Sequence, residues 1–160
     1  FEYLLIDISQ YEDESIKGTS RLALGLRVLK HIFDNPTELE QTLQRSGDHL
    51  KEIWTSRQGK EFLEVLLRYL FTSEITAKSV EKVFKDQISS AGGDLVMSTA
   101  EKLINQGMEQ GLEQGLEKGR KERDLEIVRN LTKENADHTF IAKVTGLTLD
   151  EIKKIQSELQ

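Results

Sequence analysis

The sequence predicts a mainly α-helical protein, and three observations support this fold class. Apolar residues return at spacings of three and four along most of the 160 residues, which is typical of amphipathic helices. The one proline, Pro36, follows an asparagine at a position suited to start a helix. Near residue 110, glycine returns every four residues between helix-forming side chains. We therefore expect an N-terminal strand, a helical bundle, one long helix with the glycine repeat, and a C-terminal hairpin of the helix-turn-helix type.

The composition narrows the possible functions. The net charge is −6, and phosphate contacts need clustered Lys and Arg, so any DNA contact should be local. Cysteine is absent, which excludes disulfides, thiolate metal sites and a cysteine nucleophile, and fits a reducing cytoplasm. No apolar run approaches the length of a membrane span. We expect a cytoplasmic protein that makes no membrane contact.

Residues 1–10 are expected to form a strand. The run from Phe1 to Ser9 is rich in β-prone apolar residues, which is typical of a strand buried on both faces of a sheet. No later segment resembles a second strong strand, and the chain opens on Phe1 instead of methionine. We therefore expect either that this strand is frayed here or that its partner strands lie upstream, in a longer protein of which the chain is a piece.

Residues 11–92 are expected to form a helical bundle. The first helix is apolar on nearly all sides and should therefore lie at its centre. Asn35 should cap the second helix, with Pro36 at its first position and Glu38 completing a pair like a capping box. The stretch Ser89–Gly93 should break the chain and end the bundle. The expected helices span residues 18–34, 36–50, 59–71 and 80–88.

Residues 93–134 are expected to form one long helix that carries the glycine repeat. Each interior glycine costs a helix roughly 1 kcal/mol relative to alanine, so four glycines cost about 3–4 kcal/mol. A four-residue period places the glycines in one stripe and the apolar residues in the adjoining stripe, while Glu, Gln and Lys face away. Close contact with another helix can offset the cost of the glycines.

Charged residues in every turn exclude a membrane-spanning helix, so a soluble dimer or an intrachain hairpin remains, with a frayed flexible linker as the alternative. We expect a homo-oligomer, in the simplest case a dimer. The predicted interface consists of Gly107, Met108, Gly111, Leu112, Gly115, Leu116 and Gly119.

Residues 135–160 are expected to form a helical hairpin. Thr148 should be an N-cap, with Glu151 three residues later as a capping box requires. The spacing of Ala142, Gly146 and Ile152 occurs in helix-turn-helix DNA readers, although any tight helical hairpin can use it. Acidic residues slightly outnumber basic ones here, whereas a recognition helix is usually basic. Candidate DNA contacts are Lys143, Lys153 and Lys154.

No catalytic, cofactor-binding or metal-binding residue is predicted in this chain. His31, His49 and His138 lie in three different predicted helices, without the paired spacing or acidic neighbours that metal or base chemistry needs. Asp7 is the one carboxylate on the predicted strand that could be considered as a metal ligand, and we expect it to act as a cap or turn anchor instead. Neither a Gly-x-Ser-x-Gly elbow nor a glycine-rich phosphate loop after a strand is present.

The order of the features resembles a known family. A strand like Tyr3–Ser9, an acidic turn like Glu12–Glu14 and an apolar helix like Leu22–Leu26 come first. Gly-x-Glu-Gln repeats and a closing element like Ala142–Leu147 follow. In this order they resemble the C-terminal part of the Rpn family of recombination-promoting nucleases, also described as putative transposases of the PD-(D/E)XK class. The resemblance spans essentially the whole chain.

This resemblance implies that the parent protein is a bacterial DNA endonuclease that depends on Mg²⁺ and acts in recombination. In the family, the metal-binding carboxylates and the catalytic strand lie upstream of the region that this chain resembles. The resemblance therefore implies that the strand expected over residues 1–10 belongs to the sheet of that upstream nuclease domain. Glu109 and Glu113 each precede a glutamine, but they lie on a predicted helix and cannot form the strand-borne site. No catalytic residue can therefore be carried over, and the chain itself is expected not to be an enzyme.

The resemblance implies an oligomerisation and regulatory module. Its expected partners are a second copy of the chain and the full-length nuclease, with DNA bound only weakly or through the parent. The family is also associated with short C-terminal products that bind and restrain the full-length nuclease, so the chain is a candidate inhibitor. The alternative is a DNA-binding module that acts through the C-terminal hairpin.

Overall fold

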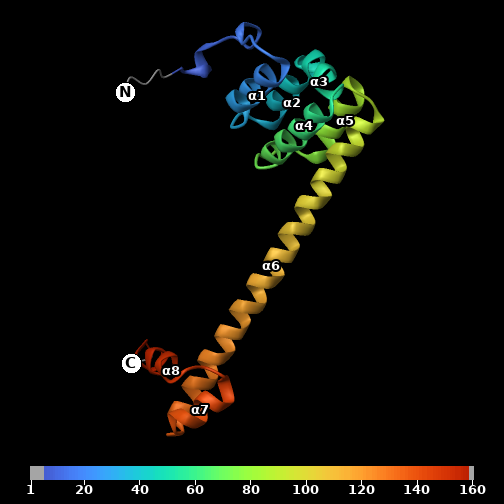
Figure 1. Cartoon of the computed structure of the whole chain (residues 1–160). Helices are drawn as coiled ribbons and strands as arrows, with labels where there is room; N and C mark the ends of the chain where they lie inside the picture. The colour runs from blue at the N-terminus through green and yellow to red at the C-terminus, as the bar shows by residue number, and fades with distance from the viewer. Residues whose placement is uncertain (1–5, 159–160) are drawn as a thin grey trace. The chain divides into compact units, whose positions relative to one another are not determined.

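The computed structural model describes residues 6–158, and within this range the chain is helical. It divides into two compact units, Phe1–Asn105 and Gln106–Gln160, each of which has its own core. Figure 1 shows the order of the helices along the chain. The helices are α1 (Ser20–His31), α2 (Pro36–Arg45), α3 (Gly47–Trp54), α4 (Arg57–Leu70), α5 (Ala77–Gln87), α6 (Ser90–Lys133), α7 (His138–Thr145) and α8 (Leu149–Glu158). The prediction of a mainly helical protein is confirmed.

The prediction of an N-terminal strand is not supported. Residues 1–5 lie outside the described residues, and Ile8–Gln10 form a short 3-10 helix, η1. The carboxylate of Asp7 accepts hydrogen bonds from the backbone N–H of Ser9 at 3.0 Å and from its hydroxyl at 2.7 Å. This local side-chain bond turns the backbone and overrides the β-propensity of the neighbouring isoleucines. Nowhere in residues 6–158 does a strand form.

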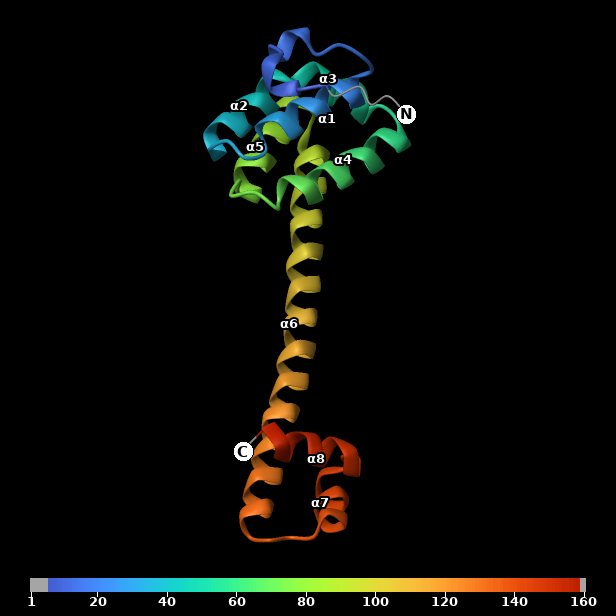
Figure 2. The ribbon, with the colours of Figure 1, turned by 90° about the vertical axis from the view of Figure 1, so that its left-hand side faces the viewer.

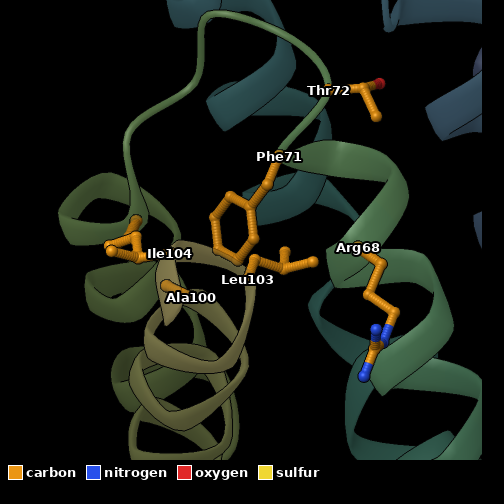
Figure 3. Close-up of a pocket in the computed structure, with 7 residues that line it drawn as sticks. Arg68, Phe71, Thr72, Ala100, Leu103 and Ile104 are labelled. Atoms are coloured by element: carbon orange, nitrogen blue, oxygen red, sulfur yellow. The ribbon is translucent and has the colours of Figure 1, made fainter. Parts of the chain in front are cut away.

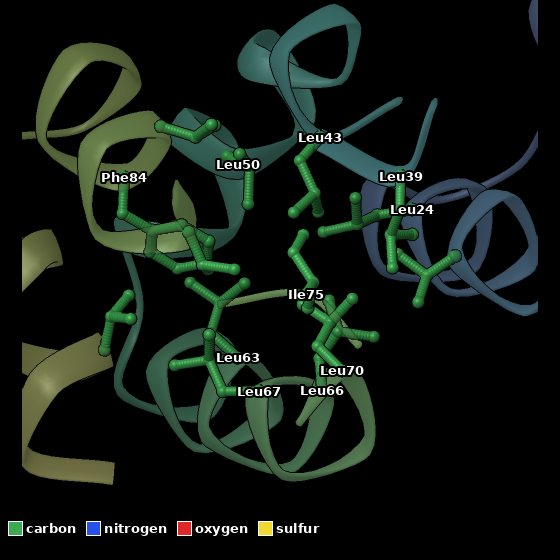
Figure 4. Packing of buried hydrophobic residues seen from close by; sticks show 14 of the residues in the cluster. Leu24, Leu39, Leu43, Leu50, Leu63, Leu66, Leu67, Leu70, Ile75 and Phe84 are labelled. Atoms are coloured by element: carbon green, nitrogen blue, oxygen red, sulfur yellow. The ribbon is translucent and has the colours of Figure 1, made fainter. Parts of the chain in front are cut away.

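The first unit packs α1 to α5 and the beginning of α6 around one apolar core, which Figure 4 shows from close by. Helix α4 contributes most to this core because four of its leucines recur at helical spacing on one face. Figure 2 shows the same helices from a second side. The fully buried side chains of the core include Leu24, Leu39, Leu43, Leu50, Leu63, Leu67, Leu70 and Phe84.

Helix starts in the first unit follow local capping. The side chain of Asn35 accepts a hydrogen bond from the N–H of Glu38 at 3.0 Å, with Pro36 at the first position of α2. The helix expected over residues 36–50 is instead two helices, α2 and α3, which meet at Ser46. Helix α1 is less central than expected because Leu22 and Leu29 are half exposed.

The break expected over Ser89–Gly93 falls at its start, because Ile88 and Ser89 separate α5 from α6, whereas both glycines lie in the first turn of α6. A Cβ atom at residue 92 would lie 3.1 Å from the carbonyl oxygen of Phe84 and 3.1 Å from the Cβ of Ile88. Glycine therefore allows α6 to start close against the end of α5. At this position glycine allows α6 to lie close to the end of α5, and the helical bundle continues into α6.

The second unit contains the C-terminal part of α6 together with α7 and α8. Its small core consists of Val128, Ile141 and Ile152, all fully buried. Gly146 ends α7 in the left-handed conformation with φ of 76°, which favours glycine. Thr148 and Glu151 then exchange hydrogen bonds as a capping box at the start of α8.

Over the described residues, no helix combines the length and the apolar character that crossing a bilayer requires.

Candidate functional site

The seven residues of the predicted interface lie on consecutive turns of α6 and are exposed to solvent. We call them the glycine seam: Gly107, Met108, Gly111, Leu112, Gly115, Leu116 and Gly119. A Cβ atom built on any of the four glycines would meet no atom within 4 Å outside its own helix backbone and adjacent residues. Met108, Leu112 and Leu116 are 69%, 66% and 58% exposed. The glycine seam is therefore an open surface with no packing partner in the described chain.

The arrangement suits contact with another helix. Three large apolar side chains at a spacing of four lie close together on the helix, and exposed apolar patches often mark interaction surfaces. The neighbouring glycines carry no side chain, so a second backbone can approach this side of α6 closely. The glycine, methionine and leucine side chains of the glycine seam provide no group for acid-base chemistry.

Charged side chains near the end of the glycine seam pair within the helix. Lys121 contacts Glu117 at 2.6 Å, and Lys118 contacts Glu122 at 3.8 Å, both at i,i+4 spacing. The hydrogen bond from Lys121 holds the pKa of Glu117 below its usual range. These pairs support an isolated helix modestly, because exposed ion pairs are screened by water.

A second apolar surface, which sequence reasoning missed, lies in the first unit. A groove of about 410 Å³ lies between the end of α4 and the beginning of α6. Phe71, at the end of α4, faces Ala100 and Leu103 of α6 there (Figure 3). Arg68 at its edge contacts Glu64, at 3.5 Å. The groove can accept an apolar side chain. No sequence signal identified it, because its wall combines residues from three helices.

The three lysines proposed for DNA contact are exposed, but they do not form one cluster on one helix. Lys143 lies in the last turn of α7, whereas Lys153 and Lys154 lie on α8. The first turn of α8 carries Asp150 and Glu151. The expected hairpin geometry is present, but the helix that would enter a DNA groove begins with two carboxylates.

His31 has acidic neighbours, contrary to the sequence-based expectation. Its ring lies between Asp34, at the i+3 position, and Asp13 of the 3-10 helix η2 (Asp13–Ser15). The spacing to Asp34 could have been read from the sequence. The contact to Asp13 could not, because 18 residues separate the two.

His49 lies beside a buried hydroxyl but does not form a nucleophile pair with it. The Ser20 hydroxyl donates its proton to Glu52 at 2.7 Å and lies 2.9 Å from Nδ1 of His49. A hydroxyl has one proton, so while Ser20 donates it to Glu52 the serine oxygen can only accept a hydrogen bond from Nδ1–H of His49. The arrangement is a chain of hydrogen bonds that ties α1 to α3.

The described residues do not fit the Mg²⁺ that the family resemblance implies for the parent protein. Within residues 6–158, no group of three or more His, Asp or Glu side chains is placed to hold a metal ion.

Over residues 6–158 the protein is helical, and it exposes a row of apolar side chains on α6. Comparison with protein families gives a more particular result: residues 1–61 match the family described as putative transposase, YhgA-like. The matched stretch contains α1, α2, α3 and the start of α4. It supports a relationship to a putative transposase family, and it ends before the glycine seam. Comparison with the curated proteins and with the solved structures finds no match.

Proposed function

We propose that this chain is the non-catalytic C-terminal module of an Rpn-type DNA endonuclease, and that α6 holds copies of the protein together as a dimer. The observation that carries the proposal is the glycine seam, where three large apolar side chains are exposed beside four glycines. The match of residues 1–61 to a putative transposase family supports the parent class. The parent would require Mg²⁺, held by residues that this chain does not supply.

The energetics favour a buried seam. Four glycines weaken the helix by about 3–4 kcal/mol. At about 25 cal/mol per Å² of buried apolar surface, roughly 150 Å² must be buried on each helix to offset this cost. Met108, Leu112 and Leu116 together can supply more than that area, and the surplus must also cover the entropy lost on association. In a solvated helix no burial of apolar surface would offset the free-energy cost of the glycines.

Light scattering of purified protein at tens of micromolar tests the dimer. The double variant Gly111→Leu with Gly115→Leu should be monomeric, because the added side chains force tightly packed backbones apart. Glu113→Leu with Glu117→Leu is the matched control, since it adds the same side chains on the face opposite the glycine seam. The proposal fails if the wild type is monomeric, or if the seam variant assembles as tightly as the wild type.

A regulatory role follows if the full-length nuclease carries the same seam. The isolated chain would then compete for α6 of the nuclease and restrain it as an inhibitor. A pull-down with full-length nuclease should capture the wild type and lose the leucine seam variant, while the control variant is retained.

The chain alone should cleave no DNA with Mg²⁺ or Mn²⁺ present. Dose-dependent nicking by a pure sample, lost in Asp7→Ala, would contradict the non-catalytic role.

The second candidate function is a DNA-binding module, favoured by the geometry of the C-terminal hairpin. Three residues, including Gly146 in its left-handed conformation, connect α7 to α8, and Ile152 is fully buried. Electrophoretic mobility shift with double-stranded DNA tests it. Binding below the micromolar range at physiological salt, abolished by Lys153→Glu with Lys154→Glu and steeply dependent on salt, would favour this function over the first.

A further inference from the structure

Three basic side chains on one face of α1 bind the segment that precedes this helix. Arg27 donates from Nε to the backbone carbonyl of Asp13 at 3.0 Å. Lys30 donates from Nζ to the carbonyl of Tyr11 at 2.8 Å and to Oδ1 of Asp13 at 2.9 Å. His31 completes the set, and the spacing of 27, 30 and 31 places all three on the same side of the helix. We call residues 11–16 the gripped segment; its last residue, Ile16, is buried.

The His31 ring contacts a carboxylate at each of its two nitrogens. Nε2 lies 3.0 and 3.1 Å from the two carboxylate oxygens of Asp13, and Nδ1 lies 2.6 Å from Oδ2 of Asp34. An ionised carboxylate can only accept hydrogen bonds, so both ring nitrogens must carry a proton to satisfy both partners. Only the imidazolium form does so. The side chains of His31 and Asp13 are 17% and 12% exposed, which leaves little room for water to replace a lost contact.

The surrounding charges favour the protonated ring. Burial lowers the pKa of His31, but the hydrogen bonds to Asp13 and Asp34 and the charge of Asp13 outweigh burial and the repulsion from Lys30, so its pKa lies above the usual value. Burial raises the pKa of Asp13, and its contacts with Lys30 and His31 reverse this, so that its pKa lies below the usual value. In the described part of the chain, Asp13 and Asp34 are the charged groups within ion-pair distance of the His31 ring.

We propose that His31 is a pH-sensitive latch that holds the gripped segment against α1 when protonated and releases it when neutral. On loss of the proton, one ring nitrogen presents a lone pair to a carboxylate, and an attractive contact becomes repulsive. When the neutral ring keeps its proton on Nδ1, towards Asp34, Nε2 no longer donates to Asp13. Lys30 then remains as the donor to the Asp13 carboxylate, and Arg27 as the donor to its backbone carbonyl. Because Asp13 fixes the path of the chain just before Ile16 and α1, the latch controls how firmly this part of the chain is attached to the first unit.

A spin label on the gripped segment tests the latch. The chain contains no cysteine, so Glu14→Cys introduces a single labelling site at an exposed position. The nitroxide should be immobilised at about pH 5 and become mobile towards about pH 9, where histidine is neutral. The midpoint should lie above 6.5, the ordinary histidine value, and should coincide with the titration of the His31 ring followed by NMR.

Substitutions in the labelled chain separate the latch from a general effect of pH. His31→Gln cannot be charged, so its label should be mobile at every pH, whereas His31→Arg keeps a fixed cation and should stay immobilised. Asp34→Asn removes one partner at a partly exposed position and should lower the midpoint without unfolding the unit. His138→Gln, in the second unit, is the control and should titrate as the wild type does. A label whose mobility ignores pH in the wild type, or a transition that persists in His31→Gln, would overturn the proposal.

Discussion

Replacing the four glycines of the glycine seam with alanine should strengthen α6 in the monomer and weaken the dimer. In the chain itself, a methyl group at these positions meets no atom within 4 Å beyond the local helix, so no clash opposes the change. Alanine is favoured over glycine in a helix by roughly 1 kcal/mol per residue. The quadruple variant should therefore gain about 4 kcal/mol of helix stability in this stretch.

Amide hydrogen exchange at concentrations where the protein is monomeric measures the first effect. One kcal/mol corresponds to about a fivefold change in an equilibrium, so each substitution should slow exchange around its position by about that factor. Gln110→Ala is the matched control on the outward face and should have little effect, because glutamine and alanine differ little in helix propensity.

Sedimentation equilibrium measures the second effect, which has the opposite sign. If partner backbones touch at Gly111, adding a methyl group there overpacks the contact at a cost of about 1–3 kcal/mol, which raises the dissociation constant roughly fivefold to a hundredfold. Two results would refute the reasoning: monomer exchange that does not slow, or an alanine variant whose dimer is as tight as the wild type. The first would contradict an exposed helix, and the second would contradict contact through the glycines.

Three further predictions concern stability. Gly59→Ala should destabilise the first unit by roughly 1–3 kcal/mol, measured by thermal unfolding, because its Cβ would clash with the carbonyl oxygen of Ile53. Chemical denaturation across pH should show that Asp13 and His31 both stabilise between 3.8 and 6.5, their ordinary values. The contribution of Asp13, whose pKa is lowered, is lost on acidification, and that of His31, whose pKa is raised, is lost as pH rises. Ile152→Ala should cost about 2–5 kcal/mol and abolish exchange protection in α7 and α8, because the core of the second unit is small.

Elements with local causes could be predicted from the sequence. The start of α2 depends on Asn35, Pro36 and Glu38, which are close in the chain and act through backbone hydrogen bonds. The helical character of the glycine stretch could be inferred in the same way, because its helix-forming residues outnumber its glycines. In both cases neighbouring residues determine the backbone, so the pattern contains the required information.

Elements that depend on competition or on distant contacts could not be predicted. The β-prone isoleucines near Asp7 form a 3-10 turn because one carboxylate offers the backbone a better local bond than an absent sheet. Gly92 belongs to a glycine pair of the kind that often breaks a helix. In the folded chain it instead allows close contact with the backbone of Phe84, which can be seen only once the helices are packed. Propensity gives the average behaviour of a residue, and tertiary contacts decide these exceptions.

The glycine seam and the His31 latch differ in the same way. The cost of glycine in a helix is a local property, so four glycines in register indicate a missing partner from the amino-acid pattern alone. The latch joins His31 to Asp13 across 18 residues, and an isolated histidine in a sequence carries no sign of the carboxylate that will face it. A residue that destabilises its own helix, such as an interior glycine, can thus be recognised in the sequence. A residue that acts through a distant neighbour, such as His31, can be recognised only in the folded structure. For this reason the helix that carries the glycines could be predicted from the sequence, and the contact between His31 and Asp13 could not.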